Sequence, residues 1–188
     1  MITVLRIGHR PQRDKRITTH VALVARAFGA DSIVISGEDP KIRETVDEVV
    51  DTWGGSFSLS FEGWKSFLST FEGTVVHLTM YGIPFEGPME EIRAAPGDLC
   101  IVVGAEKVPP QVYQRADYNL SVGTQPHSEV AALALFLDRY FAGNEFKKQF
   151  GGARLSIIPS GQGKVVNGDR HPSLAHGPHS CQSPHGNV

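Results

Sequence analysis

The chain has 188 residues, of which 40% are hydrophobic and 20% charged, and its formal net charge at pH 7 is −2. This length suits one domain with a substantial core, and no apolar run approaches the roughly 20 residues of a membrane-spanning helix. The first residues are already strand-like and the two cysteines lie far apart in the sequence. We therefore expect no signal peptide, no disulfide framework, no membrane partner and a location in the reducing cytoplasm.

The charge is unevenly distributed along the chain. Residues 1–26 contain six arginines or lysines against a single carboxylate, Asp14, which gives this segment +5 and leaves −7 for the remainder. A basic segment on a mildly acidic body favours an anionic partner, above all a phosphate backbone. The alternative is a solvated loop whose arginines pair with neighbouring carboxylates.

Predicted strands and helices alternate along almost the whole chain. In chain order they are strand 3–8, a helix that Thr18 or Thr19 can cap and that ends near Gly29, strand 32–36, helix 39–52, strand 56–61, helix 64–71, strand 74–80, helix 86–94, strand 99–103, helix 109–116, strand 118–122, helix 127–141 and an edge segment at 155–158. Such alternation is typical of an α/β fold with a mostly parallel sheet flanked by helices.

The helix predicted at residues 127–141 is the most apolar in the chain. Leu133 and Leu137 belong to one apolar stripe, and Leu135 and Phe136 belong to a second. A helix that is apolar on two sides needs cover on two sides. One side can pack on the sheet, so we predict that the other meets a second copy of the chain in a homodimer.

Beyond about Gly161 the sequence loses periodicity and fills with Gly, Pro, Ser, Asn and His. We therefore assign residues 1–166 to one domain and residues 167–188 to a flexible polar tail. The tail contains four histidines and Cys181, but their spacing matches no zinc motif. We expect no metal site.

Two segments, residues 101–109 and 122–131, each run from an apolar strand through a glycine turn into the start of a helix. Such a turn gathers free backbone N–H groups beside the positive end of a helix, and two of them at one sheet edge can enclose a small polar ligand. The first segment is also compatible with an ordinary strand-to-helix turn. The second carries amide, imidazole, hydroxyl and carboxylate groups at a helix start, although Ser128 and Glu129 are also compatible with a cap of that helix. His77 and Tyr81 flank a third strand end, where His77 is equally compatible with a satisfied interior histidine.

The usual cofactor and catalytic motifs are missing from the sequence. It has no G-x-G-x-x-G after a strand, no Walker spacing, no G-x-S-x-G and no H-E-x-x-H. The ligand is therefore expected to bind through less common loops.

Six strings within residues 1–166 resemble the archaeal tRNA cytidine 2′-O-methyltransferases, a branch of the SPOUT methyltransferase superfamily. They are residues 8–16, 18–23, 25–30, 76–82, 102–109 and 125–134. The strings are long and specific, and the tail lies outside the resemblance.

The resemblance implies an α/β fold whose C-terminal part threads a deep trefoil knot, and a dimer that binds S-adenosylmethionine in the knot loops. General chain statistics argue against knots, so only the resemblance supports this expectation. By matching motifs, the implied cofactor contacts are Leu78, Gly104, Ala105, Glu106, Lys107, Val108, Val122, Gly123, Thr124, Gln125, Pro126, His127, Ser128 and Glu129.

The implied reaction moves a methyl group to the ribose 2′-oxygen of cytidine 56 in the T-loop of tRNA. The weakly acidic hydroxyl needs help in losing its proton, a role assigned in related enzymes to an arginine of the first motif, aided by an RNA phosphate. In the superfamily this motif has an Asn, five further residues and an Arg, and it leads to a glycine. Counting forward from the Asn position, His20 and Arg26 fit the spacing. Counting back from Gly29 instead puts the arginine position on Leu23.

The catalytic candidates are therefore several arginines of the basic segment. We favour Arg16, and keep Arg10 and Arg26 as alternatives. The candidates for binding the tRNA are Arg10, Arg13, Lys15 and His20.

Two other functions remain open at this point. One is a dimeric RNA-binding protein that keeps the fold without catalysis. The other is a flavodoxin-like nucleotide-binding or signalling domain, which would have acidic or phosphate-site residues after its first strand. The basic residues that follow His9 favour a macromolecular anion over that second alternative.

Overall fold

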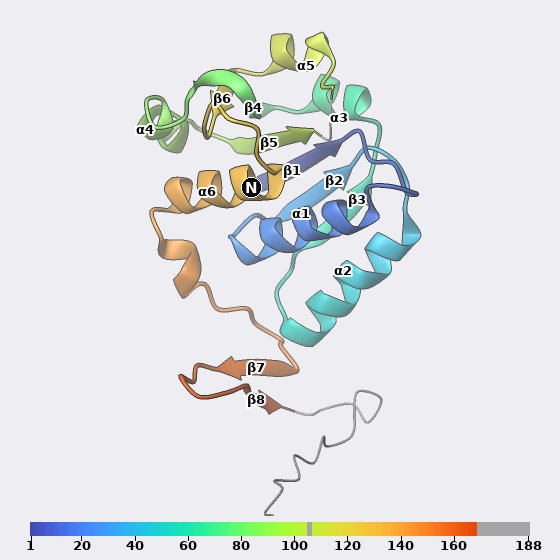
Figure 1. Ribbon diagram of the computed structural model, residues 1–188, viewed down its shortest axis with the longest axis vertical. Helices are drawn as coiled ribbons and strands as arrows, with labels where there is room; N and C mark the ends of the chain where they lie inside the picture. Colours follow the sequence, from blue (N-terminus) through green and yellow to red (C-terminus); the bar gives the residue numbers. More distant parts are fainter. Residues whose placement is uncertain (105–106, 169–188) are drawn as a thin grey trace, which may run out of the picture. The chain divides into compact units, whose positions relative to one another are not determined.

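The computed structural model describes residues 1–104 and 107–168 and divides the chain into two units, Met1–Ala153 and Arg154–Val188. In the first unit, six strands form one sheet in the order β3-β2-β1-β5-β4-β6, and every adjacent pair is parallel. Helices cover both of its faces (Figure 1). The expected α/β fold with a mostly parallel sheet is confirmed.

The elements of the first unit follow the predicted alternation. The strands are β1 (Ile2–Ile7), β2 (Ser32–Ile35), β3 (Ser58–Phe61), β4 (Gly73–Pro84), β5 (Asp98–Gly104) and β6 (Tyr118–Ser121). The helices are α1 (Lys15–Ala27), α2 (Pro40–Trp53), α3 (Trp64–Thr70), α4 (Met89–Ala94), α5 (Pro110–Arg115), α6 (Glu129–Phe141) and the 3₁₀ helix η1 (Asn144–Lys147).

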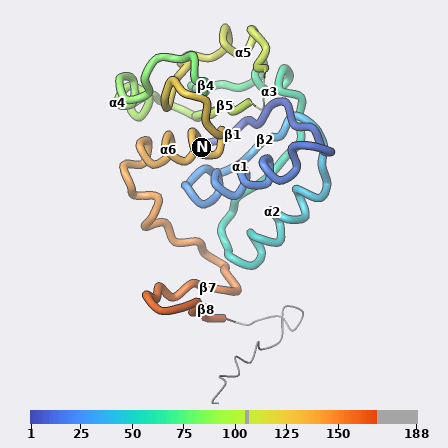
Figure 2. Tube along the Cα trace, in the orientation of Figure 1, coloured from blue at the N-terminus to red at the C-terminus, as the bar shows by residue number. Residues whose placement is uncertain are grey.

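Two apolar layers hold the sheet between the helices. Because side chains alternate across a strand, Val4 of β1 and Ile101 of β5 face the layer that contains buried residues of α1, α2, α4 and α6. Leu5 and Val102 face the opposite layer, which contains Leu68 of α3 and Val112 of α5. Helix α6 lies against α1 in the first of these layers (Figure 2).

Helix α1 begins earlier than predicted, so the assignment of Thr18 or Thr19 as its cap is wrong. The helix starts at Lys15 with Asp14 at the N-cap, because a hydrogen-bonded turn already joins Arg10 to Asp14. The Thr18 hydroxyl is buried and forms a 2.9 Å hydrogen bond with Nδ1 of His9. A threonine that resembles a cap in the sequence thus fixes the preceding loop to the helix.

Strand β4 is longer than predicted and is irregular in its second half. Its register against β6 shifts between Leu78 and Ile83, so residues 79–82 form a bulge. A Cβ on Gly82 would lie 2.4 Å from the carbonyl oxygen of Asn119, so only glycine allows this close approach of the two backbones. The bulge directs Thr79, Met80 and Tyr81 toward the site described below.

Helix α6 is buried on one side and partly exposed on the other. Leu133 and Leu137 of the first predicted stripe and Phe136 of the second are all buried. The covered side of α6 therefore includes residues of both stripes. Leu135 is 47% exposed. An apolar residue is therefore available on the outer side of α6 for the predicted homodimer, which stays a prediction.

The second unit contains an antiparallel pair, β7 (Leu155–Ile158) and β8 (Val165–Gly168). The predicted edge segment at 155–158 is thus a strand of a separate two-stranded sheet. Most of the predicted tail, including its histidines and Cys181, lies outside the described residues. Within the part of the chain that the structure describes, no helix is long and apolar enough to cross a membrane.

Candidate active site

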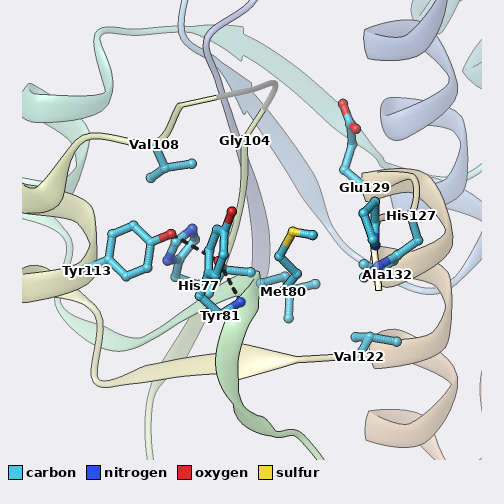
Figure 3. A pocket seen from close by; sticks show the side chains of 13 residues that line it. His77, Met80, Tyr81, Gly104, Val108, Tyr113, Val122, His127, Glu129 and Ala132 are labelled. Atoms are coloured by element: carbon cyan, nitrogen blue, oxygen red, sulfur yellow. Dashed lines mark hydrogen bonds between the residues drawn. The ribbon is translucent and has the colours of Figure 1, made fainter. Parts of the chain in front are cut away.

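A pocket of about 260 Å³ opens where β4, β5 and β6 end (Figure 3). Its walls are formed by the β4 bulge, the turn after β5, the loop after β6, and residues from α5 and α6. The lining residues are His77, Leu78, Thr79, Met80, Tyr81, Gly104, Val108, Tyr113, Val122, Pro126, His127, Glu129 and Ala132. Carboxyl ends of parallel strands are the usual position of ligand sites in α/β proteins.

The β4 bulge and α5 are joined across one wall of the pocket. The hydroxyl groups of Thr79 and Tyr113 form a 3.1 Å hydrogen bond, and the Thr79 hydroxyl also accepts a 3.4 Å bond from the backbone N–H of Tyr81. Tyr81 lines the pocket and is 81% exposed. The bulge is therefore anchored at Thr79 while its tip remains open to solvent.

Gly104, at the end of β5, and Val108 approach each other closely beside the pocket. A Cβ on Gly104 would lie 2.3 Å from Cγ2 of Val108, so Val108 can pack over the strand end only because residue 104 is glycine. Both residues line the pocket, whereas Lys107 is exposed and does not. Ala105 and Glu106, two of the predicted cofactor contacts, lie outside the described residues.

The loop after β6 leads into α6 through a series of local hydrogen bonds. The Ser121 hydroxyl accepts a 3.1 Å bond from the Gly123 N–H, and the Ser128 hydroxyl accepts a 3.2 Å bond from the Val130 N–H, which caps α6. The His127 ring forms a 2.6 Å hydrogen bond with the Gln125 carbonyl. The hydrogen bond that caps α6 is thus enough to explain the orientation of the Ser128 side chain.

The structure brings about half of the predicted cofactor contacts to the pocket wall. These are Leu78, Gly104, Val108, Val122, Pro126, His127 and Glu129. Four other residues of the same prediction are exposed and lie outside the lining set: Gly123, Thr124, Gln125 and Ser128.

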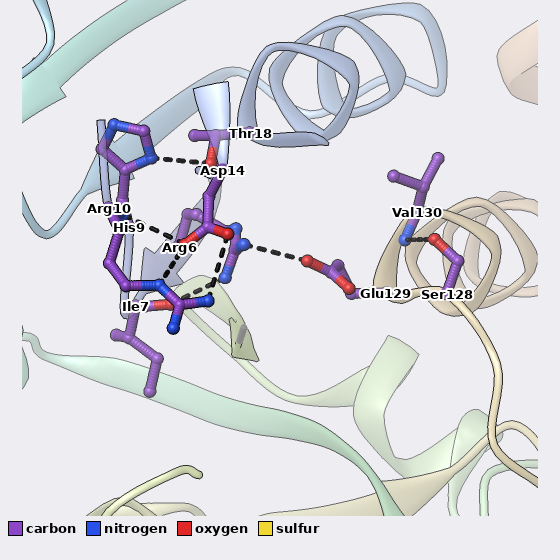
Figure 4. Close-up of polar contacts among 9 residues, drawn as sticks. All are labelled: Arg6, Ile7, His9, Arg10, Asp14, Thr18, Ser128, Glu129 and Val130. Atoms are coloured by element: carbon purple, nitrogen blue, oxygen red, sulfur yellow. Dashed lines mark hydrogen bonds and ion pairs between the residues drawn. The ribbon is translucent and has the colours of Figure 1, made fainter. Parts of the chain in front are cut away.

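A buried arginine that the sequence does not indicate as a site residue contacts the pocket residue Glu129. Nη2 of Arg6 lies 2.9 Å from Oε1 of Glu129, and its Nη1 donates a 2.7 Å hydrogen bond to the Ile7 carbonyl (Figure 4). The Arg6 side chain is fully buried, and burial lowers its pKa, an effect that the nearby Glu129 and Asp14 carboxylates oppose. Arg6 therefore carries a charge in the interior that Glu129 compensates.

The basic loop before α1 is held in a defined shape next to this pair. Nε of Arg10 donates a 2.8 Å bond to the Asp14 carboxylate, and the Arg10 backbone N–H donates to the same group, so the pKa of Asp14 is lowered. His9 lies buried between Thr18 and Asp39, with its Nε2 3.4 Å from Oδ2 of Asp39. These contacts fix the loop close to Arg6 and hence close to the pocket (Figure 4).

The predicted catalytic and tRNA-binding residues lie in two different environments. Arg13, Lys15, Arg16 and His20 are exposed on the loop and on α1. Arg26, at the other end of α1, is only 8% exposed, donates a 2.6 Å bond to the Gly54 carbonyl and lies over the Phe150 ring. Burial lowers the pKa of Arg26, and its contacts are those of a residue that joins α1 to neighbouring loops.

Several pocket residues were not predicted as site residues. Tyr113 carries no local motif, and neither does Arg6, which contacts the lining residue Glu129. Thr79 and Met80 lie at the end of a strand that the sequence pattern terminates at residue 80, within the bulge. The sequence indicates His77 and Tyr81 only as the two residues that flank a strand end. The detectable signal was Gly82, since an isolated glycine near a strand end is typical of a bulge.

Within the described ranges, 1–104 and 107–168, no group of three or more His, Cys, Asp or Glu side chains is arranged to hold a metal ion.

Comparison with solved structures identifies the class of protein that this fold defines. A structure described as an RNA 2′-O ribose methyltransferase matches with a TM-score of 0.57 and 17% identity, over 77% of this chain and 56% of that one. The A. aeolicus TrmH/SpoU tRNA modifying enzyme matches with a TM-score of 0.55 and 16% identity, over 78% of this chain and 76% of that one. A third structure is that of the SpoU methyltransferase AviRb from Streptomyces viridochromogenes in complex with AdoMet. It matches with a TM-score of 0.53 and 13% identity, over 76% of this chain and 57% of that one. The fold is that of the SpoU/TrmH methyltransferases.

Sequence comparison narrows this class to one family. The family described as tRNA ribose 2′-O-methyltransferase, aTrm56, matches residues 53–167. The tRNA (cytidine(56)-2′-O)-methyltransferase of Pyrococcus abyssi is 55% identical over 172 residues, which cover 88% of this chain and 87% of that protein. The enzyme of the same name from Methanothrix thermoacetophila is 59% identical over 170 residues, covering 88% and 96%. The chain belongs to the aTrm56 family of tRNA ribose 2′-O-methyltransferases.

Proposed function

We propose that this protein transfers a methyl group from S-adenosylmethionine to the ribose 2′-hydroxyl of cytidine 56 in tRNA. The observation that carries the proposal is the identity of 55–59%, over nearly the whole length of both chains, to relatives that bear this activity in their names. The basic loop beside the pocket supports a polyanionic substrate.

The pocket residues fit the cofactor. Leu78, Val108 and Val122 provide apolar surface for a flat aromatic ring, whereas Glu129 and His77 provide polar groups. We propose that Leu78, Gly104 and Val108, together with the loop from Val122 to Glu129, hold the cofactor, and that Ala105, Glu106 and Lys107 complete the turn that surrounds it. When bound, the cofactor supplies an electrophilic methyl group on its sulfonium.

The residues of the chain then have two roles, to hold the ribose in line and to assist the loss of its proton. We propose Arg16 as the residue that interacts with the reacting ribose, because it is exposed in the first turn of α1 directly after the fixed loop. Arg10 is the second candidate. Arg13, Lys15 and His20 would bind phosphates, as would Arg10 if it is not the reacting residue. The contacts of Arg26 with Gly54 and Phe150 favour a structural role for it instead.

We further propose that the segment leading into α6 threads a deep trefoil knot, and that two copies associate through the outer side of α6. The likeness to SpoU/TrmH structures supports the first. The exposed Leu135 supports the second. The cytoplasm, where tRNA is found, is the proposed location.

Methyl transfer from labelled S-adenosylmethionine to an unmodified tRNA transcript tests the proposal. A matched transcript with 2′-deoxycytidine at position 56 is the control, since it lacks only the acceptor oxygen. We expect label on the first transcript and none on the second. Equal labelling of both would place the methyl group elsewhere, and cofactor binding without labelling would indicate a different substrate or a non-catalytic RNA-binding protein.

A further inference from the structure

One polar atom in the pocket wall has no partner that accounts for it. His77 lies on β4, its side chain is 0% exposed, and its ring packs edge-on against the Tyr113 ring with the centroids 4.6 Å apart (Figure 3). Nδ1 of His77 forms a 2.8 Å hydrogen bond with Oδ1 of Asn119. The second ring nitrogen, Nε2, is buried and has no hydrogen-bond partner among the described residues.

The neighbours of His77 fix which ring nitrogen carries the hydrogen. Nδ2 of Asn119 donates a 2.9 Å bond to the Tyr113 carbonyl, so the amide oxygen of Asn119 is the atom that faces His77. An amide oxygen only accepts, and Nδ1 of His77 must therefore be protonated. Burial also lowers the pKa of His77, which favours the neutral ring. In the neutral ring with a proton on Nδ1, Nε2 is an acceptor with a free lone pair.

A buried acceptor without a donor is costly and uncommon in folded proteins. The hydroxyl groups of Tyr113 and Thr79 form a hydrogen bond with each other, and neither of them forms one with Nε2 of His77. His77 nevertheless belongs to the lining of the pocket, so a molecule bound there lies beside this residue. The adjacent lining from Leu78 and Val108 is apolar, which suits the adenosine part of the cofactor better than its charged amino-acid part.

We propose that Nε2 of His77 accepts a hydrogen bond from an N–H or O–H group of the adenosine moiety of the bound cofactor. The inference rests on the proposed function, since it requires that the pocket binds S-adenosylmethionine. It also explains why Asn119 and His77 are paired, because Asn119 sets the tautomer of the ring and His77 presents the acceptor to the ligand.

The first test measures binding of S-adenosylhomocysteine and of 5′-methylthioadenosine, which lacks the amino-acid part, by calorimetry. The variant His77→Asn keeps an amide donor at the position of Nδ1 but has no atom at the position of Nε2. We expect it to bind both ligands about three- to tenfold more weakly than the wild type, the range of one neutral hydrogen bond. His77→Phe keeps the ring volume and is the matched control for the space that the shorter side chain leaves. We expect His77→Phe to lose affinity for both ligands by the same factor as His77→Asn.

The second test uses the wild-type protein, so it does not depend on a variant that folds. The ¹⁵N resonance of Nε2 in His77 should be that of an unprotonated nitrogen and should move upfield when S-adenosylhomocysteine binds. If the wild type binds the ligands and both variants bind them with the same affinity as the wild type, the inference for His77 is overturned while the proposed function stands. The same holds if the wild type binds S-adenosylhomocysteine and the Nε2 resonance does not move. Failure of the wild type to bind either ligand would instead overturn the assignment of the pocket to the cofactor.

Discussion

The pair formed by Arg6 and Glu129 offers a sharp test of how the pocket is supported. The Arg6 side chain is 0% exposed and that of Glu129 is 21% exposed, and the two groups are 2.9 Å apart. Replacing Glu129 by alanine leaves the guanidinium in the interior without its carboxylate. Removing one partner of a fully buried pair costs about 3–5 kcal/mol, and partial access of water at Glu129 reduces this to about 2–3 kcal/mol.

The assay is urea unfolding of the protein without cofactor, so that any role of Glu129 in cofactor binding does not enter. For a chain of this length, a loss of about 2–3 kcal/mol corresponds to a decrease in Tm of roughly 4–12 °C. Glu129→Gln, which keeps an oxygen near Arg6 but not the charge, should lose less. Glu44→Ala, an exposed carboxylate on α2, controls for the change in net charge and should lie within about 0.5 kcal/mol of wild type.

A double variant separates this reasoning from a simple loss of contacts. Combining Glu129→Ala with Arg6→Met removes the unpaired buried charge. The loss of unfolding free energy in the double variant should therefore be smaller than the sum of the losses in the two single variants, by about 1 kcal/mol or more. Additive losses, or a Glu129→Ala protein as stable as wild type, would refute the view that Glu129 compensates a buried charge.

The remaining predictions concern the reaction, the turn and the interior. Arg16→Ala should fold and bind S-adenosylhomocysteine as wild type does but lose methyl transfer; full activity would move the role to Arg10. Arg26→Ala should lower the free energy of unfolding by about 2 kcal/mol in a urea titration, since it removes a buried hydrogen bond and the packing on Phe150; an unchanged midpoint would contradict this. Gly104→Ala should weaken cofactor binding at least tenfold in calorimetry, because its Cβ would displace Val108; wild-type affinity would refute that steric argument. Burial raises the pKa of Cys100 to about 12, so in a Cys181→Ser protein, which lacks the only other cysteine of the sequence, thiol reagents at pH 8 should label Cys100 only after unfolding; rapid labelling of that protein in its native state would contradict this.

The sequence predicts the sheet well because its signals are local. Unbroken apolar runs such as Leu99–Val103 mark strands that are buried on both faces, and alternation with helices indicates parallel pairing. The order of the strands is set by packing between distant segments, and no local pattern encodes it. The start of α1 was misjudged because Thr18 has the chemistry of a cap, while its actual partner is the His9 ring.

The loops that line the site can be predicted from the sequence, whereas the buried residues that contact them cannot. Glycine turns after β5 and β6 are visible as short motifs, and six residues of these two segments line the pocket. Arg6 resembles any strand residue in the sequence, because its partner Glu129 lies 123 positions away. His77 likewise acquires its tautomer from Asn119, which β6 brings beside β4.

The position of the transferred methyl group decides whether the proposed reaction is correct. After reaction with S-adenosylmethionine, the tRNA transcript is digested and the fragments are analysed by mass spectrometry. We predict one added methyl group, on the ribose of nucleotide 56, with the base unchanged. A methyl group on a base, or on the ribose of another nucleotide, would contradict the proposed reaction.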